Sequence, residues 1–365
     1  MMVQHTPGDR NEHSAMRNII AIGGLAGSTQ ALRDLFSNLP AELPAILLVA
    51  THFPGSDYDH LPSVLRRSGS FPVKTAEDGE PIRLGQAYVA VADRHLLVRN
   101  GRVRLVRGPT ENRFRPAIDP LFRSVAVEFG PRAVGIVLSG ALNDGTSGLR
   151  AIKRCGGVAI VQDPDDALHP SMPRSAQRHV NFDHILPARA IGSILAELSE
   201  QEVNLQAAPP VPQDIKIELA MTEQTMNGIE GNKELGRGTM FTCPDCGGVL
   251  SEIEHDDLQR YRCHVGHSYT AEAMMISQSE SLEHSLWAAI AALQQRAKLC
   301  ESLLERARAS KLTHTIRDLE RQIRESYKHA AVLRRMVLRG QEFSHNQEPS
   351  VRTSRQFEPS DAPSP

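Results

Sequence analysis

The sequence predicts an α/β fold with a doubly wound, mostly parallel sheet over residues 17–200. Short apolar runs rich in β-branched residues, typical of strands buried on both faces, alternate along the chain with amphipathic helical patterns. That alternation is typical of a parallel sheet with helices on both faces. The expected strands are 19–22, 46–50, 87–91, 134–138 and 158–161, and the expected helices are 29–38, 59–68, 120–128 and 146–154.

A hairpin is expected within the same domain. Two alternating runs flank Asn100-Gly101, a pair that favours the left-handed backbone of a type I′ turn. The sheet is therefore expected to include an antiparallel piece.

The composition excludes several function classes. The 41 Lys and Arg residues balance 43 Asp and Glu residues, so no overall positive field draws the chain to nucleic acid or anionic membranes. No apolar run reaches the length of about 18 residues that membrane insertion requires. The polar N-terminus lacks the apolar core of a secretory signal, and the 5 cysteines in 365 residues do not form a disulfide framework. A soluble cytoplasmic protein is expected.

The rest of the chain divides into segments of different character. Apolar residues that step by three and four predict two helices that form a helical hairpin or coiled coil, with a surface for self-association. The expected segments are a disordered N-terminus (1–16), the α/β domain (17–200), a Pro-rich linker (201–238), a Cys/His module (239–270), the helical hairpin (271–340) and a disordered tail (341–365).

The first candidate site lies at the carboxyl ends of the predicted strands, where function collects in open α/β sheets. Segments 23–28, 51–54 and 139–145 meet there and bring His52 and Asp144 to a glycine-rich turn that suits an oxyanion. From the residues alone, a lone histidine after a strand, such as His52, is more often a hydrogen-bonded structural residue, and Asp144 also fits the cap of the helix that follows it. The turn carries Leu25, which has no nucleophilic atom, where a reactive hydroxyl is expected.

A resemblance to a known family adds to this interpretation. Over residues 17–200 the chain resembles the catalytic domain of the chemotaxis protein-glutamate methylesterases (CheB-type), in a stand-alone form without a receiver domain. The resemblance rests on Ala21-Ile-Gly-Gly24 with Ala31-Leu32, His52-Phe-Pro54, Ala76-Glu-Asp-Gly-Glu-Pro81, the segments 88–98 and 115–123, Leu138-Ser-Gly-Ala-Leu-Asn-Asp-Gly145, the segment 156–163 and Met172-Pro-Arg-Ser-Ala176.

The resemblance implies hydrolysis of glutamyl γ-methyl esters, and deamidation of glutamine, on chemoreceptor helices, with no cofactor for catalysis. It assigns His52 as general base and Asp144 as the acid that orients it. Ala26 and Ala141 fall where the turn binds the oxyanion. The nucleophile position aligns on Leu25 without a gap.

Because Leu25 cannot act as a nucleophile, the sequence does not decide whether the chain hydrolyses esters. Ser28 is a weak substitute, because on a helix its Cβ lies about 5–6 Å from that of position 25, and we interpret it as the N-cap of the next helix. A protein-glutamate methylesterase and a catalytically inactive binder of receptor or partner helices therefore both remain.

The second candidate site is a predicted zinc knuckle. Cys243 and Cys246 have C-x-x-C spacing, and Cys263 follows with His264 and His267 close behind. Three thiolates and one imidazole complete a tetrahedral structural zinc site, and the spacing favours His267 over His264 as the fourth ligand. Free thiols and a redox C-x-x-C are the alternatives. Segments 249–253 and 259–262 are expected to form a zinc-ribbon hairpin. Nucleic-acid binding is not expected, because the sequence around residues 243–267 has no basic patch interleaved with aromatic residues.

Overall fold

A computed structural model describes residues 14–52, 60–225, 235–253 and 258–345. The expected disorder of residues 1–13 and 346–365 lies outside these residues. By its internal contacts the chain forms one unit up to Ser277 and a second from Gln278 onward.

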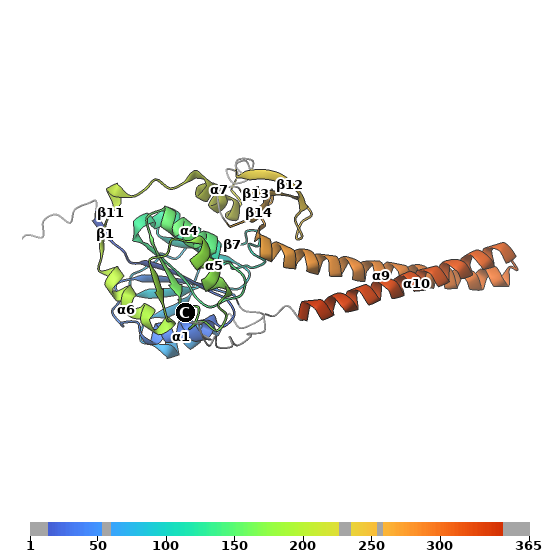
Figure 1. Cartoon of the computed structure of the whole chain (residues 1–365), viewed down its shortest axis with the longest axis horizontal. Coiled ribbons are helices and arrows are strands. Elements are labelled where there is room, and N and C mark those ends of the chain that lie inside the picture. Colours follow the sequence, from blue (N-terminus) through green and yellow to red (C-terminus); the bar gives the residue numbers. More distant parts are fainter. Residues whose placement is uncertain (1–13, 53–59, 226–234, 254–257, 346–365) are drawn as a thin grey trace, which may run out of the picture. The chain divides into compact units, whose positions relative to one another are not determined.

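The first unit is built on a seven-stranded, wholly parallel sheet, which confirms the predicted α/β fold (Figure 1). Its strand order is β10-β9-β8-β2-β3-β5-β4. The chain leaves the central strand β2 on one side to β3 and returns on the other side at β8, so the winding reverses between β2 and β8. The strands are β2 Ile19–Gly24, β3 Ile46–Thr51, β4 Val73–Thr75, β5 Gln86–Val89, β8 Ala133–Val137, β9 Val158–Gln162 and β10 His184–Leu186.

Successive residues of a strand point to opposite sides of the sheet. Both sides of this sheet are apolar, so helices cover both of them. Ile20 and Ile22 pack into one core with α1, α2 and α6, whereas Ile19 and Ala21 pack into the other with α3, α4 and α5. The helices are α1 Ser28–Ser37, α2 Leu61–Ser68, α3 Ile118–Phe129, α4 Thr146–Arg154, α5 Ser171–His179 and α6 Ala188–Ser199.

The predicted hairpin forms, but not as part of the main sheet. Strands β6 His95–Arg99 and β7 Arg102–Val106 form a separate two-stranded sheet, and β7 also has an isolated bridge from Arg102 to Pro81. Asn100 and Gly101 both have positive φ, as a type I′ turn requires. The pair packs on α3 rather than along a strand edge, so the expected antiparallel piece of the sheet was wrong.

The stretch expected to be a linker, 201–238, is largely structured. It contains β11 Glu202–Asn204, which pairs with β1 Ser14–Met16, and the helix α7 Gln213–Thr222. The helix packs on α3 and buries apolar Ile215 and Met221 together with charged Glu218. A helix that buries a carboxylate as well as apolar residues has no clean apolar stripe, which is why its periodicity was missed. Of the segment 1–16 that was expected to be disordered, residues 14–16 form β1.

A four-stranded antiparallel sheet follows in the same unit, in the order β12-β13-β14-β15. Its strands are β12 Gly236–Thr242, β13 Val249–Ile253, β14 Arg260–Cys263 and β15 Ser268–Thr270. We call residues 236–270 the metal module, with 254–257 outside the described part. The expected hairpin of segments 249–253 and 259–262 corresponds to the β13–β14 pair.

Two long helices, α9 Ala271–Ala309 and α10 Thr313–His345, complete the described chain. Contacts from Tyr327 to Glu301 and from Arg308 to Glu320 show that they run antiparallel. Helix α10 extends five residues beyond Gly340, into the expected tail. Apolar side chains such as Leu299, Leu303 and Met336 remain exposed on this hairpin. Its self-association stays a prediction. Among the described helices, none is long and apolar enough to cross a membrane.

Candidate functional site at the carboxyl edge of the sheet

The first site lies where three neighbouring strands, β8, β2 and β3, end together at the reversal of the winding. The backbone N–H of Leu25 donates to the carbonyl of Ser139 at 2.9 Å, and that of His52 donates to Gly24 at 3.3 Å. Position 25 therefore lies between the histidine strand end and the loop that leads to Asp144. The fold brings together the described parts of the three segments that the sequence singled out, with 53–54 outside the described residues.

Leu25 is a packed core residue, only 4% exposed. A Cβ placed on Gly140 would lie 3.0 Å from the Leu25 Cβ and 2.1 Å from the Met172 sulfur, so no side chain fits at position 140. The leucine shares its apolar cluster with Met172 and Ile118. The slot of the glycine turn thus holds a hydrocarbon side chain and no nucleophilic atom.

Ser28 does not act as the helix cap. Gly27, with φ of 76°, is the N-cap of α1, and Ser28 is the first helical residue. The left-handed φ suits glycine and disfavours serine, so the helix begins one residue earlier than expected. Ser28 is 0% exposed, and its hydroxyl has no hydrogen-bond partner among the described residues. The hydroxyl is enclosed below Gly24, whose added Cβ would lie 2.4 Å from the Ser28 Cβ.

His52 is a half-buried imidazole beside an aromatic ring. Its ring centroid lies 3.7 Å from that of Phe114. Burial, aided by the charge of Arg113, lowers the pKa of His52 to about 4. The imidazole is therefore neutral near pH 7, which is the form that accepts a proton.

Asp144 does not cap the helix that follows it, because Gly145 is the N-cap of α4. Its carboxylate instead accepts the backbone N–H groups of Ile118 at 2.7 Å and Asp119 at 3.3 Å, which begin α3. The Asn112 amide donates to it at 3.0 Å. Burial and the neighbouring Asp119 carboxylate nevertheless raise the pKa of Asp144.

The rim of the site holds strained backbone. Ala26 and Ala141, predicted to border the oxyanion position, are both exposed, and the Ala26 carbonyl accepts the Ser139 hydroxyl at 2.9 Å. Leu142 has φ of 63°, a conformation that costs a non-glycine residue free energy and collects at functional sites. A pocket of 510 Å³ adjoins this loop, lined by Leu142, Asn143, Ser171, Arg174, Ser175, Gln177, Arg178 and Glu272.

Below the site, His95 is fully buried and holds the loop that carries Asn112. Its Nε2 donates to the carbonyl of Pro109 at 2.9 Å, and its Nδ1 accepts the N–H of Ala117 at 3.1 Å. This pair of bonds needs the neutral imidazole. Burial lowers the pKa of His95 to about 4, against the opposing charge of Glu111.

Acidification is expected to weaken the fold through His95. The folded pKa of about 4 lies below the unfolded value of about 6.5, so the unfolded chain binds the extra proton. The stabilisation is complete above about pH 6.5 and is lost as the pH falls towards 4, by up to about 3 kcal/mol. Urea unfolding at a series of pH values measures this loss. His95→Gln should flatten the pH dependence and exposed His60→Gln should not; equal slopes in both variants would contradict the assignment.

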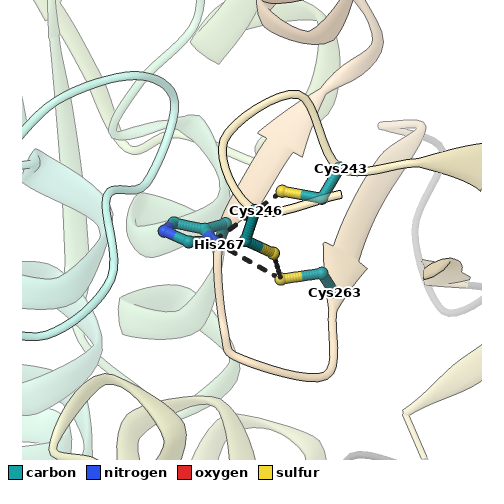
Figure 2. Close-up of side chains that lie close together, drawn as sticks. All are labelled: Cys243, Cys246, Cys263 and His267. Atoms are coloured by element: carbon teal, nitrogen blue, oxygen red, sulfur yellow. Dashed lines mark hydrogen bonds between the residues drawn. The ribbon is translucent and has the colours of Figure 1, made fainter. Parts of the chain in front are cut away.

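The second site gathers the predicted zinc ligands. The ligand atoms of Cys243, Cys246, Cys263 and His267 all lie within 4.8 Å of one another (Figure 2). The Cys246 and Cys263 sulfurs are 3.7 Å apart, and His267 Nδ1 is 3.5 Å from the Cys263 sulfur. Tetrahedral zinc, with bonds of about 2.3 Å to sulfur and about 2.0 Å to nitrogen, places its ligand atoms about 3.5–3.8 Å apart. The donor set and its spacing fit zinc.

Neighbouring groups support this cluster from outside. His264 is exposed and lies against Gly248, apart from the four converging atoms. Asp245 lies 3.9 Å from the far nitrogen of His267 and accepts the hydroxyl of Thr110, in the α/β part of the unit, at 2.6 Å. A carboxylate behind a ligating histidine orients its ring.

A buried ion cluster, which sequence patterns do not reveal, joins the metal module to the α/β core. It comprises Glu111, Arg123 of α3, Glu218 of α7, and Arg260 and Arg262 of β14, all at most 4% exposed in their side chains. Burial alone would raise the pKa of Glu111, but the charges of Arg123 and Arg262 outweigh it and lower that pKa to about 2. No local sequence pattern marks these residues, because they come from four separate elements.

The chain is similar in sequence to known proteins. Residues 20–195 match the family model described as CheB methylesterase. A protein-glutamate methylesterase/protein-glutamine glutaminase 1 from Xanthomonas campestris pv. campestris is 36% identical over 199 residues, covering 53% of this chain and 55% of that protein. A protein-glutamate methylesterase/protein-glutamine glutaminase from Yersinia pestis bv. Antiqua is 41% identical over 203 residues, covering 54% and 56%.

The chain thus spans about half the length of the curated relatives that it matches. Among solved structures, the Thermotoga maritima CheB methylesterase catalytic domain matches with 32% identity and a TM-score of 0.48, covering 50% of this chain and 98% of that one.

Proposed function

Since the chain carries a CheB methylesterase domain, we propose that it recognises glutamyl γ-methyl ester or glutamine side chains on chemoreceptor-type helices without hydrolysing them. In this role it is a binding component of a chemotaxis-type signalling system. The relatives are named as esterases and glutaminases, and this chain shares their domain.

One observation supports the proposal: Leu25 is a buried apolar residue at the position to which we assign the nucleophile. His52 is neutral near pH 7, and we assign the role of orienting acid to Asp144, which lies in the loop between β8 and α4. Loss of the serine from a triad costs about six orders of magnitude in turnover, whereas binding needs only the shaped rim.

Hydrolysis remains the second candidate function. The neutral imidazole of His52 favours it, because that form can accept a proton from a nucleophile. The only hydroxyl on the turn belongs to Ser28, and it is fully enclosed. Turnover through Ser28 would need the turn to open.

Binding to a receptor-type helix tests the proposal. A fluorescent helical peptide carrying one glutamyl γ-methyl ester is titrated with the full chain, beside the same peptide with free glutamate. We expect the ester to bind more tightly, and Ala141→Trp at the rim to weaken its binding at least about tenfold. Ala41→Trp, equally exposed at the opposite edge of the sheet, serves as the control. Equal binding by both variants, or none by the unmodified chain, would refute the proposal.

Structural zinc belongs to the same proposal. Cys243, Cys246, Cys263 and His267 would hold the ion, and four protein ligands leave no open position for catalysis. Its contribution would be to fold the metal module around the two turns that carry the ligands.

Elemental analysis of protein purified without chelators is expected to give one zinc per chain. Cys263→Ser should reduce this to none, because three ligands hold the ion far less tightly. Cys300→Ser, a buried thiol of α9, should keep the full content. A zinc-free unmodified chain would exclude the site.

A further inference from the structure

Asn112 lies between the metal module and two buried carboxylates, and both polar atoms of its side chain form hydrogen bonds with them. Its Nδ2 donates to Asp119 and to Asp144, each at 3.0 Å, and its Oδ1 accepts the backbone N–H of Thr270 at 3.1 Å. The residue is 2% exposed. Because carboxylates need a donor and an N–H needs an acceptor, only this orientation of the amide satisfies all three partners.

The backbone of Asn112 is tied to the same strand of the module. Its N–H donates to the carbonyl of Ser268 at 2.7 Å, and Ser268 donates back to Thr110 at 3.3 Å. The φ of Asn112 is 50°, a left-handed value that asparagine tolerates better than most residues. The segment around Asn112 therefore continues the pairing of β15.

Strand β15 begins directly after a metal ligand. Cys263 and His267 close the turn between β14 and β15, with the Cys263 N–H donating to the His267 carbonyl at 3.0 Å. Ser268, the partner of Asn112, is the next residue. A metal that holds both ends of this turn fixes the position of the strand that holds Asn112.

A second tie runs beside the first. The Thr270 hydroxyl donates to Asn143 at 2.6 Å, and the Asn143 amide donates to Glu272 at 2.8 Å. Asn143 directly precedes Asp144. The module therefore holds both the carboxylate and the loop that carries it.

We propose that Asn112 is a positioning residue through which the metal module fixes Asp144 at the carboxyl edge of the sheet. Whether the metal site is occupied then determines how firmly the backbone around Asp144 is held in place. This inference rests on the proposed function only in taking Asp144 as the orienting acid and the Cys/His cluster as a metal site.

Hydrogen–deuterium exchange on the full chain tests it without any activity. The amides of Ile118 and Gly145 donate to Asp144 and report whether its carboxylate is held in place. In zinc-loaded protein, Asn112→Asp keeps the size, the acceptor and the tolerance of positive φ, but it replaces the donor that faces the carboxylates. Asn112→Gly keeps only the backbone freedom. Both variants should exchange these amides about tenfold faster.

Asn204→Asp, an exposed cap outside the module, is the matched control and should leave the exchange unchanged. A residue needed only for its left-handed backbone would be replaced by aspartate and glycine without effect, so unchanged exchange in both variants overturns the positioning role. Removal of zinc by a chelator should accelerate the same amides, and leave α6 protected. Faster exchange confined to the metal module would overturn the coupling.

The two proposals fail in distinguishable ways. A chain that binds no zinc refutes the metal site, while the Asn112 variants still report on Asp144. A chain that binds no receptor-type peptide refutes the proposed function and leaves both exchange results unaffected.

Discussion

The Leu25→Ser variant is expected to release methanol from a methyl-esterified chemoreceptor fragment at least about a thousandfold faster than the unmodified chain. Serine is smaller than leucine, so it fits the space against Gly140 and leaves a small cavity. The new hydroxyl would lie on the turn next to His52, whose neutral imidazole is ready to accept its proton. Loss of the buried leucine costs stability of about 3 kcal/mol, which a domain with two cores of this size tolerates.

Two further variants separate restored catalysis from a loosened site. Leu25→Ala makes the same space without a nucleophile and should release no methanol. His52→Gln in the Leu25→Ser background should abolish the gain, because the serine then lacks its base. If Leu25→Ser were as inert as Leu25→Ala, more than the nucleophile would be missing.

Glu218→Gln is expected to lower the free energy of unfolding of the first unit by about 3–5 kcal/mol. Glu218 contacts Arg123, Arg260 and Arg262, and all four side chains are buried. The substitution removes the negative charge that these three arginines share in the buried cluster, and it leaves Glu111 paired with Arg123 and Arg262. The charges of the arginines outweigh burial and lower the pKa of Glu218, which shows that the folded unit holds it as a carboxylate.

Urea unfolding near pH 7 measures this loss. Glu77→Gln removes an exposed carboxylate paired with Lys74 and should cost no more than about 1 kcal/mol. A Glu218→Gln variant as stable as Glu77→Gln would show that the ion cluster does not hold the metal module to the core. A loss confined to the metal module would place the weakness at β14 and not in α3.

The sequence predicted those parts of the fold that local patterns control. The runs of β-branched residues became β2, β3, β5, β8 and β9, and the helix expected over 146–154 has those bounds. The glycine turn, the strand-end histidine and the ligand spacing are likewise local signals. Leu25, His52 and the cysteine cluster can therefore be located from the amino-acid sequence alone.

The remaining features depend on contacts between distant segments. The sequence predicts a linker where α7 lies, because this helix buries Glu218, whose partners lie on α3 and β14. Asn112 carries no signal at all, since its importance comes from Asp144 on one side and Thr270 on the other. The cap of α1 was misplaced by one residue because the left-handed turn at Gly27 cannot be seen in the spacing.

The claim that the site lacks a nucleophile is tested most directly by measuring methanol release by the unmodified full chain. The substrate is a methyl-esterified chemoreceptor fragment, and a blank without protein runs beside it. A rate equal to the blank is the predicted result. Turnover above the blank would contradict it, and Ser28→Ala would then show whether the enclosed hydroxyl of Ser28 is the nucleophile.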